Sequence, residues 1–125
     1  MKDNIKKIVI IEPDATIREE YRELLSAEKF DVHTAPDGKA GLDLIWREQP
    51  DCILLEILLP KIDGFEVLQK VRATAQTKGT PVILFTELGH EEDMARARHL
   101  GAHEYCVKTH HTPKEIVQKI KALLR

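Results

Sequence analysis

Short apolar runs recur along the chain and alternate with stretches that have helical spacing. The sequence predicts five β-strands, at Lys7–Ile11, Val32–Ala35, Cys52–Leu55, Val82–Phe85 and Glu104–Val107. The segments 8–11, 52–55 and 82–85 consist almost entirely of Ile, Val, Leu and Phe. Such continuous apolar runs are typical of strands covered on both faces, as in a parallel sheet.

Five amphipathic helices are predicted between and after these strands, because apolar residues recur there at helical intervals. Their stripes are Ile17, Tyr21, Leu24 and Leu25; Gly41, Leu42, Ile45 and Trp46; Phe65, Val67, Leu68 and Val71; Met94, Ala97, Arg98 and Gly101; and Ile116, Val117, Ile120, Leu123 and Leu124. Asp14 and Thr112 are expected N-caps, and Gly101 is expected to end the fourth helix. Trp46 is expected to cover the sheet. The alternation of strands and helices favours a single α/β domain over residues 1–125, with a parallel sheet.

Composition narrows the class of protein only a little. The formal net charge is −2, and 42% of the 125 residues are apolar and 32% charged, as in ordinary globular proteins. We therefore expect no nucleic-acid partner, no membrane partner and a cytoplasmic location. Cys52 and Cys106 lie inside apolar runs, which favours two reduced core thiols over a disulfide.

Polar residues with useful chemistry stand where the predicted strands end. They are Glu12 and Asp14 after the first strand, Glu56 after the third, Thr86 and Glu87 after the fourth, and Lys108 after the fifth. Ligands of parallel α/β sheets bind beyond the carboxyl ends of the strands, so these groups are predicted to line one pocket. The alternative is that acids at strand ends are solvated loop residues or helix caps. For Asp14 taken alone, the cap is the favoured interpretation.

Four segments resemble the receiver domains of two-component response regulators: IVIIEPDATIR, PDCILLEILLPKIDGFEVLQKVR, TPVILFTE and GAHEYCVKT. The resemblance covers essentially the whole chain. It implies a doubly wound, flavodoxin-like (βα)5 fold with a five-stranded parallel sheet in the order 2-1-3-4-5. In this family an aspartate after the third strand accepts a phosphoryl group from a histidine kinase. Two acids after the first strand help to hold Mg²⁺.

The resemblance assigns roles to four residues of this sequence. It implies that Glu12 is the first metal-binding acid and that Thr86 is the hydroxyl that contacts the phosphoryl group. Lys108 is the lysine that contacts the same group. Tyr105 is the aromatic residue that changes rotamer when the domain switches.

Four positions depart from the family pattern. Glu56 stands at the position of the phosphorylated aspartate, and Pro13 at that of the second metal-binding acid. Glu87 replaces what is usually a small residue, and Thr109 replaces what is usually a cis proline. The peptide bond before Thr109 is expected to be trans, since a cis bond before a residue other than proline costs about 2.5–4 kcal/mol.

These departures predict the loss of phosphoryl transfer. Only Glu12 and Glu56 remain as Mg²⁺ ligands, so Mg²⁺ binding is expected to be weak or absent, and no cofactor is assigned. Glu56 displaces its carboxylate by one methylene, and a misplacement of about 1 Å can cost roughly a hundredfold in rate. We interpret the chain as a pseudo-receiver that is not an enzyme. The alternative is a functional receiver that accepts a phosphoryl group from a histidine kinase.

Lys108 is predicted to pair with Glu56, with Glu12 and Glu87 as competitors for its ammonium group. Two interpretations of the pair stay open. In the first, Glu56 mimics the phosphorylated state. In the second, the ion pair only offsets the cost of partly burying charged groups in the pocket, with no switching.

The resemblance also implies signalling partners, which are a histidine kinase or an output domain. They would contact the surface formed by the fourth helix, the fifth strand and the fifth helix, and a homodimer is a further option. The histidines suggest no metal site, because His110 and His111 are adjacent and because His99 and His103 straddle Gly101.

Overall fold

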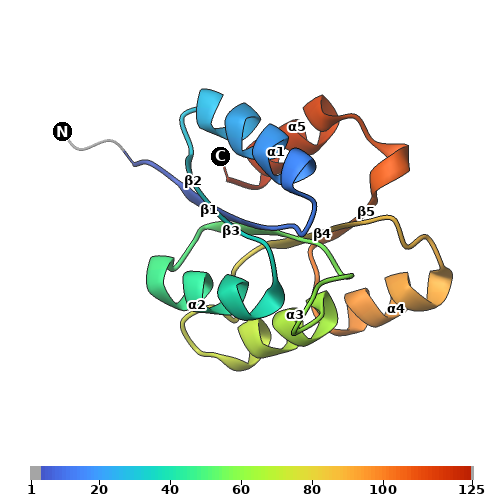
Figure 1. Cartoon of the computed structure of the whole chain (residues 1–125). Coiled ribbons are helices and arrows are strands. Elements are labelled where there is room, and N and C mark those ends of the chain that lie inside the picture. Colours follow the sequence, from blue (N-terminus) through green and yellow to red (C-terminus); the bar gives the residue numbers. More distant parts are fainter. Residues whose placement is uncertain (1–3, 125) are drawn as a thin grey trace.

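The computed structural model describes residues 4–124, which form a five-stranded sheet packed between two layers of helices (Figure 1). The strands are β1 (Lys7–Ile11), β2 (Asp31–Ala35), β3 (Cys52–Leu55), β4 (Val82–Thr86) and β5 (Glu104–Val107). All four strand pairings are parallel, and the strand order is β2-β1-β3-β4-β5. The predicted fold and strand order are therefore confirmed.

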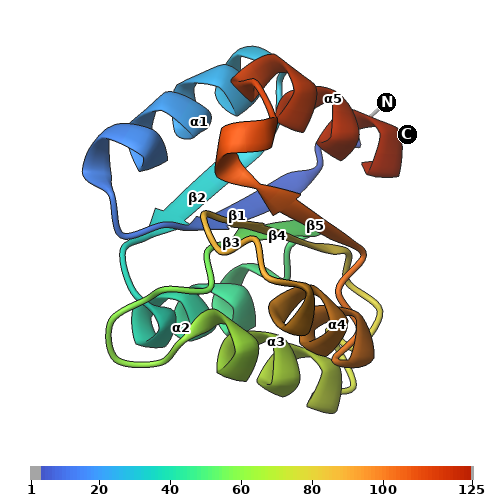
Figure 2. The ribbon, with the colours of Figure 1, turned by 90° about the vertical axis from the view of Figure 1, so that its right-hand side faces the viewer.

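Five α-helices cover the two faces of the sheet. They are α1 (Ala15–Ala27), α2 (Gly38–Glu48), α3 (Gly64–Ala73), α4 (Glu91–His99) and α5 (Pro113–Leu124). Helices α1 and α5 lie on one face, and α2, α3 and α4 lie on the other (Figures 1 and 2). None of the helices within residues 4–124 is long and apolar enough to cross a membrane.

The continuous apolar strands contribute side chains to two separate apolar cores, one on each face of the sheet. In β1, Val9 and Ile11 belong to the core beneath α2, α3 and α4, whereas Ile8 and Ile10 belong to the core beneath α1 and α5. Successive side chains of a strand point to opposite faces, so a strand covered on both faces needs an apolar residue at every position. All four of these side chains are at most 1% exposed.

Side-chain caps define where most of the helices begin. Asp14 accepts hydrogen bonds from the backbone N–H groups of Thr16 and Ile17, at 2.9 and 3.1 Å, so it is the predicted N-cap of α1. At the start of α5, Thr112 and Glu115 cap each other's backbone N–H groups at 2.8 and 3.2 Å. Helix α4 ends at His99, two residues before Gly101, which has a φ of 93°.

The prediction that Trp46 covers the sheet is wrong. Its side chain is 37% exposed, and it belongs to neither apolar core. Consecutive residues on an α-helix differ in direction by about 100°, so Trp46 turns away from the sheet when its neighbour Ile45 is fully buried. The buried face of α2 consists of Gly38, Gly41, Leu42, Leu44 and Ile45.

Candidate functional site: an acid–lysine cluster at the carboxyl rim

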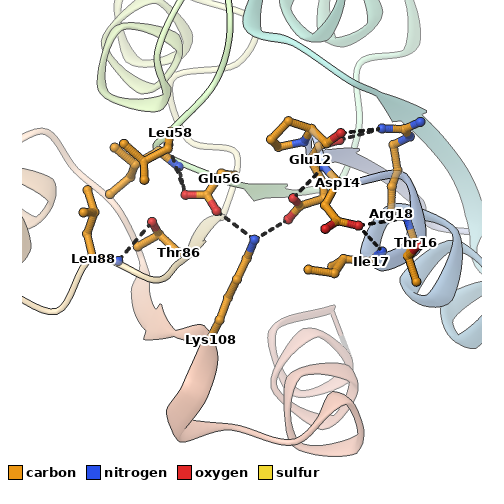
Figure 3. A network of polar contacts seen from close by, with 12 residues as sticks. Glu12, Asp14, Thr16, Ile17, Arg18, Glu56, Leu58, Thr86, Leu88 and Lys108 are labelled. Carbon is orange, nitrogen blue, oxygen red and sulfur yellow. Dashed lines mark hydrogen bonds and ion pairs between the residues drawn. The ribbon is translucent and has the colours of Figure 1, made fainter.

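Three of the predicted site residues meet at the carboxyl edge of the sheet (Figure 3). Glu12 follows β1, Glu56 follows β3 and Lys108 follows β5. Strands β1 and β3 are neighbours, so the two glutamates leave the sheet side by side. The long side chain of Lys108 reaches past the end of β4 to join them.

The ammonium group of Lys108 is shared between the two carboxylates. Its Nζ atom lies 2.7 Å from Oε1 of Glu12 and 2.7 Å from Oε1 of Glu56. The side chains are 11% exposed for Lys108, 3% for Glu12 and 5% for Glu56, so the cluster is almost removed from water. The same ammonium lies 5.3 Å from the ring centroid of Phe85, within the range of a cation–π contact. The predicted pairing of Lys108 with Glu56 is thus present, and Glu12 participates equally.

Glu56 has no oxygen left without a partner. Its Oε2 atom accepts hydrogen bonds from the backbone N–H groups of Ile57 and Leu58, at 2.7 and 3.0 Å. The carboxylate therefore folds back onto its own loop, which the extra methylene of Glu relative to Asp permits. Gly64 supports this loop from behind, because a Cβ atom there would lie 2.4 Å from the backbone carbonyl oxygen of Glu56. Only glycine allows the start of α3 to approach so closely.

The carboxylate of Glu12 is held by the backbone N–H of Asp14 and by Lys108. Its Oε2 atom accepts a 3.1 Å hydrogen bond from the backbone N–H of Asp14. Burial raises the pKa of Glu12, although Lys108 and the N–H of Asp14 oppose this shift. Burial by itself would lower the pKa of Lys108, but its contacts with Glu12 and Glu56 outweigh burial and raise the pKa.

Asp14 and Glu87 do not belong to this cluster, so the site is smaller than predicted. Both residues are exposed. The side chain of Asp14 is used to cap α1, and Figure 3 shows it directed at that helix. Glu87 follows Thr86 on the loop after β4, and within residues 4–124 it takes part in no ion pair. Glu87 directly follows β4 just as Glu12 follows β1 and Glu56 follows β3, so a position at a strand end does not by itself bring an acid into the cluster.

Thr86 and Tyr105 are linked through the backbone of Leu88. Thr86 is fully buried, and its Oγ1 atom accepts a 3.4 Å hydrogen bond from the N–H of Leu88. The hydroxyl of Tyr105 donates a 2.7 Å hydrogen bond to the carbonyl of the same residue. Burial, with the nearby acids Asp93 and Glu56, raises the pKa of Tyr105 to about 12, so the phenol stays protonated as a donor.

Mg²⁺ does not fit the residues present. Mg²⁺ needs carboxylate oxygens arranged for octahedral coordination at about 2.0–2.1 Å. Here one oxygen of each glutamate contacts the Lys108 ammonium, and the other accepts backbone hydrogen bonds. Pro13 offers no side-chain ligand at the neighbouring position. The Lys108 ammonium already occupies the position between the two carboxylates where a metal ion would have to bind.

Several supporting groups were not predicted from the sequence. The backbone N–H groups of Ile57 and Leu58 hold Glu56, and no pattern of residue types marks them. Arg18 donates to the carbonyl oxygen of Glu12 at 2.8 Å, and it stands six residues away on α1. Its spacing after Glu12 in the sequence is compatible with this contact but does not specify it. The peptide bond before Thr109 is trans, as expected, and Lys108–His110 form a short 3₁₀ turn.

The sheet order, the two-sided helical layers and the charged rim define an α/β domain of the receiver type. Residues 8–121 match the family model described as the response regulator receiver domain. The chain therefore belongs to the response regulator receiver family, and it is a receiver domain of two-component signalling.

Individual relatives agree with this assignment. The chain is 38% identical to the probable transcriptional regulator ycf27 of Guillardia theta, over 96% of this chain and 46% of that protein. A CheY-like receiver domain protein of Methanospirillum hungatei has a TM-score of 0.90 and 28% identity, covering 97% of this chain and 94% of that one. The BeF3-activated receiver domain of Klebsiella pneumoniae RstA has a TM-score of 0.86 and 29% identity, covering 95% and 98%. The chain spans about half the length of the curated relatives it matches.

Proposed function

We propose that this receiver acts as a protein–protein interaction module without accepting a phosphoryl group. The observation that carries the proposal is the position of the Lys108 ammonium, 2.7 Å from both Glu12 and Glu56. Phosphoryl transfer relies on precise placement and on neutralisation of charge by a metal. In this chain both oxygens of Glu56 are already engaged, one by Lys108 and one by its own loop. Neither is available for in-line attack on a phosphodonor.

We propose further that the Glu56–Lys108 pair substitutes for part of the phosphorylated state. By resemblance to the family, the lysine after β5 contacts the phosphoryl group, and Lys108 here makes a contact of this kind with Glu56. The hydroxyl that would make the second contact belongs to Thr86. Its oxygen accepts a hydrogen bond from the backbone N–H of the loop residue Leu88 instead. We therefore propose that the chain mimics only the contact between the lysine and the phosphoryl group, and not the contact of the hydroxyl.

The surface of α4, β5 and α5 is the proposed docking surface for the partner. One groove lies between α4 and β5 and is lined in part by Met94 and Tyr105, and a second lies along α5 and is lined in part by Gln118 and Ala122. By resemblance, the partner is a histidine kinase or an output domain, and a second copy of the chain is an alternative. The same resemblance supports a cytoplasmic location for the proposed module.

Intact-mass spectrometry after incubation with acetyl phosphate and Mg²⁺ tests the absence of phosphorylation. We expect the mass of the protein to stay unchanged. A stoichiometric gain of about 80 Da, the mass of one phosphoryl group, that maps to Glu56 would overturn the proposal.

Backbone NMR of the Glu56→Gln variant tests the mimicry separately. Gln is nearly isosteric but carries no charge, so it weakens the contact with Lys108. If the pair sets the signalling state, we expect shifts that spread to Leu88, Tyr105 and the proposed docking surface. Shifts confined to the pocket would reject mimicry while leaving the interaction module intact. Glu87→Gln is the matched control, because Glu87 is exposed, and it should shift only its own neighbours.

A further inference from the structure

A second cluster of metal-ligating side chains lies at the edge strand β2, away from the carboxyl rim where Glu56 lies. Asp31 and His33 are on the edge strand β2, and Glu48 is the last residue of α2. The Nε2 atom of His33 lies 3.1 Å from Oδ1 of Asp31 and 3.5 Å from Oε1 of Glu48. One ligand atom from each of the three residues falls within 4.8 Å of the others.

The His33 nitrogen is close to both carboxylates but is hydrogen-bonded to neither. Its Nε2 atom is buried and has no hydrogen-bond partner, although two acceptors lie within 3.5 Å. Buried ring nitrogens normally have a partner, so this one needs an explanation. A shared ion between the three ligand atoms would supply it.

The spacing of the ligand atoms suits zinc. Zn²⁺ binds His nitrogen and carboxylate oxygen at about 2.0–2.2 Å in tetrahedral geometry, which places neighbouring ligand atoms about 3.4 Å apart. The two distances from His33, 3.1 and 3.5 Å, agree with this separation. An imidazole ligand favours Zn²⁺ over Mg²⁺ or Ca²⁺, which prefer oxygen. We propose that Asp31, His33 and Glu48 bind Zn²⁺, with water as the fourth ligand.

Lys7 is the competitor that the metal has to displace. Its Nζ atom lies 3.3 Å from Oε1 of Glu48, the oxygen nearest His33, and its side chain is 40% exposed. Arg47 contacts the other oxygen of Glu48, Oε2, at 3.3 Å, so it does not compete for Oε1. The Lys7–Glu48 pair is only partly buried, and solvent screening keeps its contribution to the free energy modest, so a divalent cation can replace the ammonium. Removing the Lys7 charge should therefore strengthen zinc binding.

Titration calorimetry with ZnCl₂ tests this site on the whole chain. We expect one saturable equivalent for the wild type, loss of that binding in His33→Ala, and tighter binding in Lys7→Met. His99→Ala is the control, because His99 is an exposed histidine away from the cluster, and it should bind as the wild type does. Binding that is absent in the wild type, or retained in His33→Ala, would overturn the proposal. Loss of binding in His99→Ala would also overturn it.

NMR of the histidine side chains locates the bound ion in the wild-type protein, so this test does not depend on the folding of a variant. On addition of Zn²⁺ to the wild type, the Nε2 resonance of His33 should shift, while those of His99 and His110 should not. A shift at His110 without one at His33 would assign the zinc to the exposed histidines after β5 and reject the site. Glu56→Gln should keep the His33 shift, because Glu56 lies at the carboxyl rim after β3 and is not part of this cluster.

Discussion

The hydroxyl of Tyr105 is hydrogen-bonded to the backbone carbonyl of Leu88, at 2.7 Å. This contact joins β5 to the loop that follows β4. The ring of Tyr105 is partly buried against the core beneath α2, α3 and α4. The aromatic residue that the family resemblance assigns to switching is thus anchored in an inward position.

Tyr105→Phe is predicted to loosen this loop. The variant removes one hydrogen bond and leaves the Leu88 carbonyl to water, so we expect a loss of about 0.5–1.5 kcal/mol in unfolding free energy. Urea denaturation measures the loss, and hydrogen exchange of residues 87–90 measures the loosening. Tyr21→Phe is the control, because the hydroxyl of Tyr21 makes no hydrogen bond to another residue within residues 4–124. Equal effects of the two variants would contradict the prediction.

Glu56 and Lys108 are predicted to be coupled in a double-mutant cycle. With Glu56→Gln and Lys108→Met we expect a coupling free energy of about 1 kcal/mol or more, because the pair is largely buried. Lys108→Met should be the more destabilising single change, since it leaves two buried carboxylates without their cation. The exposed pair Glu28–Lys121, 2.8 Å apart, should show a smaller coupling in the same type of cycle. A coupling of zero for Glu56 and Lys108 would reject the pair as a stabilising contact.

Alkaline pH is predicted to remove the contribution of Lys108 to the unfolding free energy. Its pKa is raised in the folded protein, so the folded state holds this proton more tightly than the unfolded state does. The stabilisation is complete below the unfolded value of 10.5 and is lost as the pH rises through the higher folded value. The difference in unfolding free energy between wild type and Lys108→Met should therefore shrink above pH 10.5. A difference that stays constant there would contradict the assignment.

The contribution of Glu12 to the unfolding free energy is predicted to depend on pH in the acidic range. Burial raises its pKa above 4.5, so the folded protein binds this proton more tightly than the unfolded chain. Its contribution to stability falls as the pH rises from 4.5 through the folded pKa. Glu12→Gln should remove that fall, which urea denaturation of both proteins across this range would detect. If the difference in unfolding free energy between the wild type and Glu12→Gln does not vary with pH in this range, burial does not raise the pKa of Glu12.

Much of the fold could be predicted because it depends on patterns that the sequence displays directly. Strands such as β3, buried on both faces, need unbroken apolar runs, and parallel pairing places Glu12, Glu56 and Lys108 on one rim. The details of the site depend on side-chain torsions that no pattern records. Glu56 turns back to its own loop, Asp14 turns outward to cap α1, and Lys108 divides its ammonium between two acids.

Restoring two family residues is predicted to restore metal binding and phosphorylation. Pro13→Asp returns a carboxylate beside Glu12, and Glu56→Asp shortens the acid so that it can no longer fold back onto the N–H groups of Ile57 and Leu58 in the same way. Mg²⁺ then competes with the Lys108 ammonium for the carboxylates and gains the oxygen ligands it requires. Calorimetry should show weak or absent Mg²⁺ binding by the wild type, stronger binding by Pro13→Asp and the strongest by the double variant. Only the double variant should gain a phosphoryl group from acetyl phosphate by intact mass. Submillimolar Mg²⁺ affinity of the wild type at this pocket would refute the argument that Lys108 has taken the place of the metal.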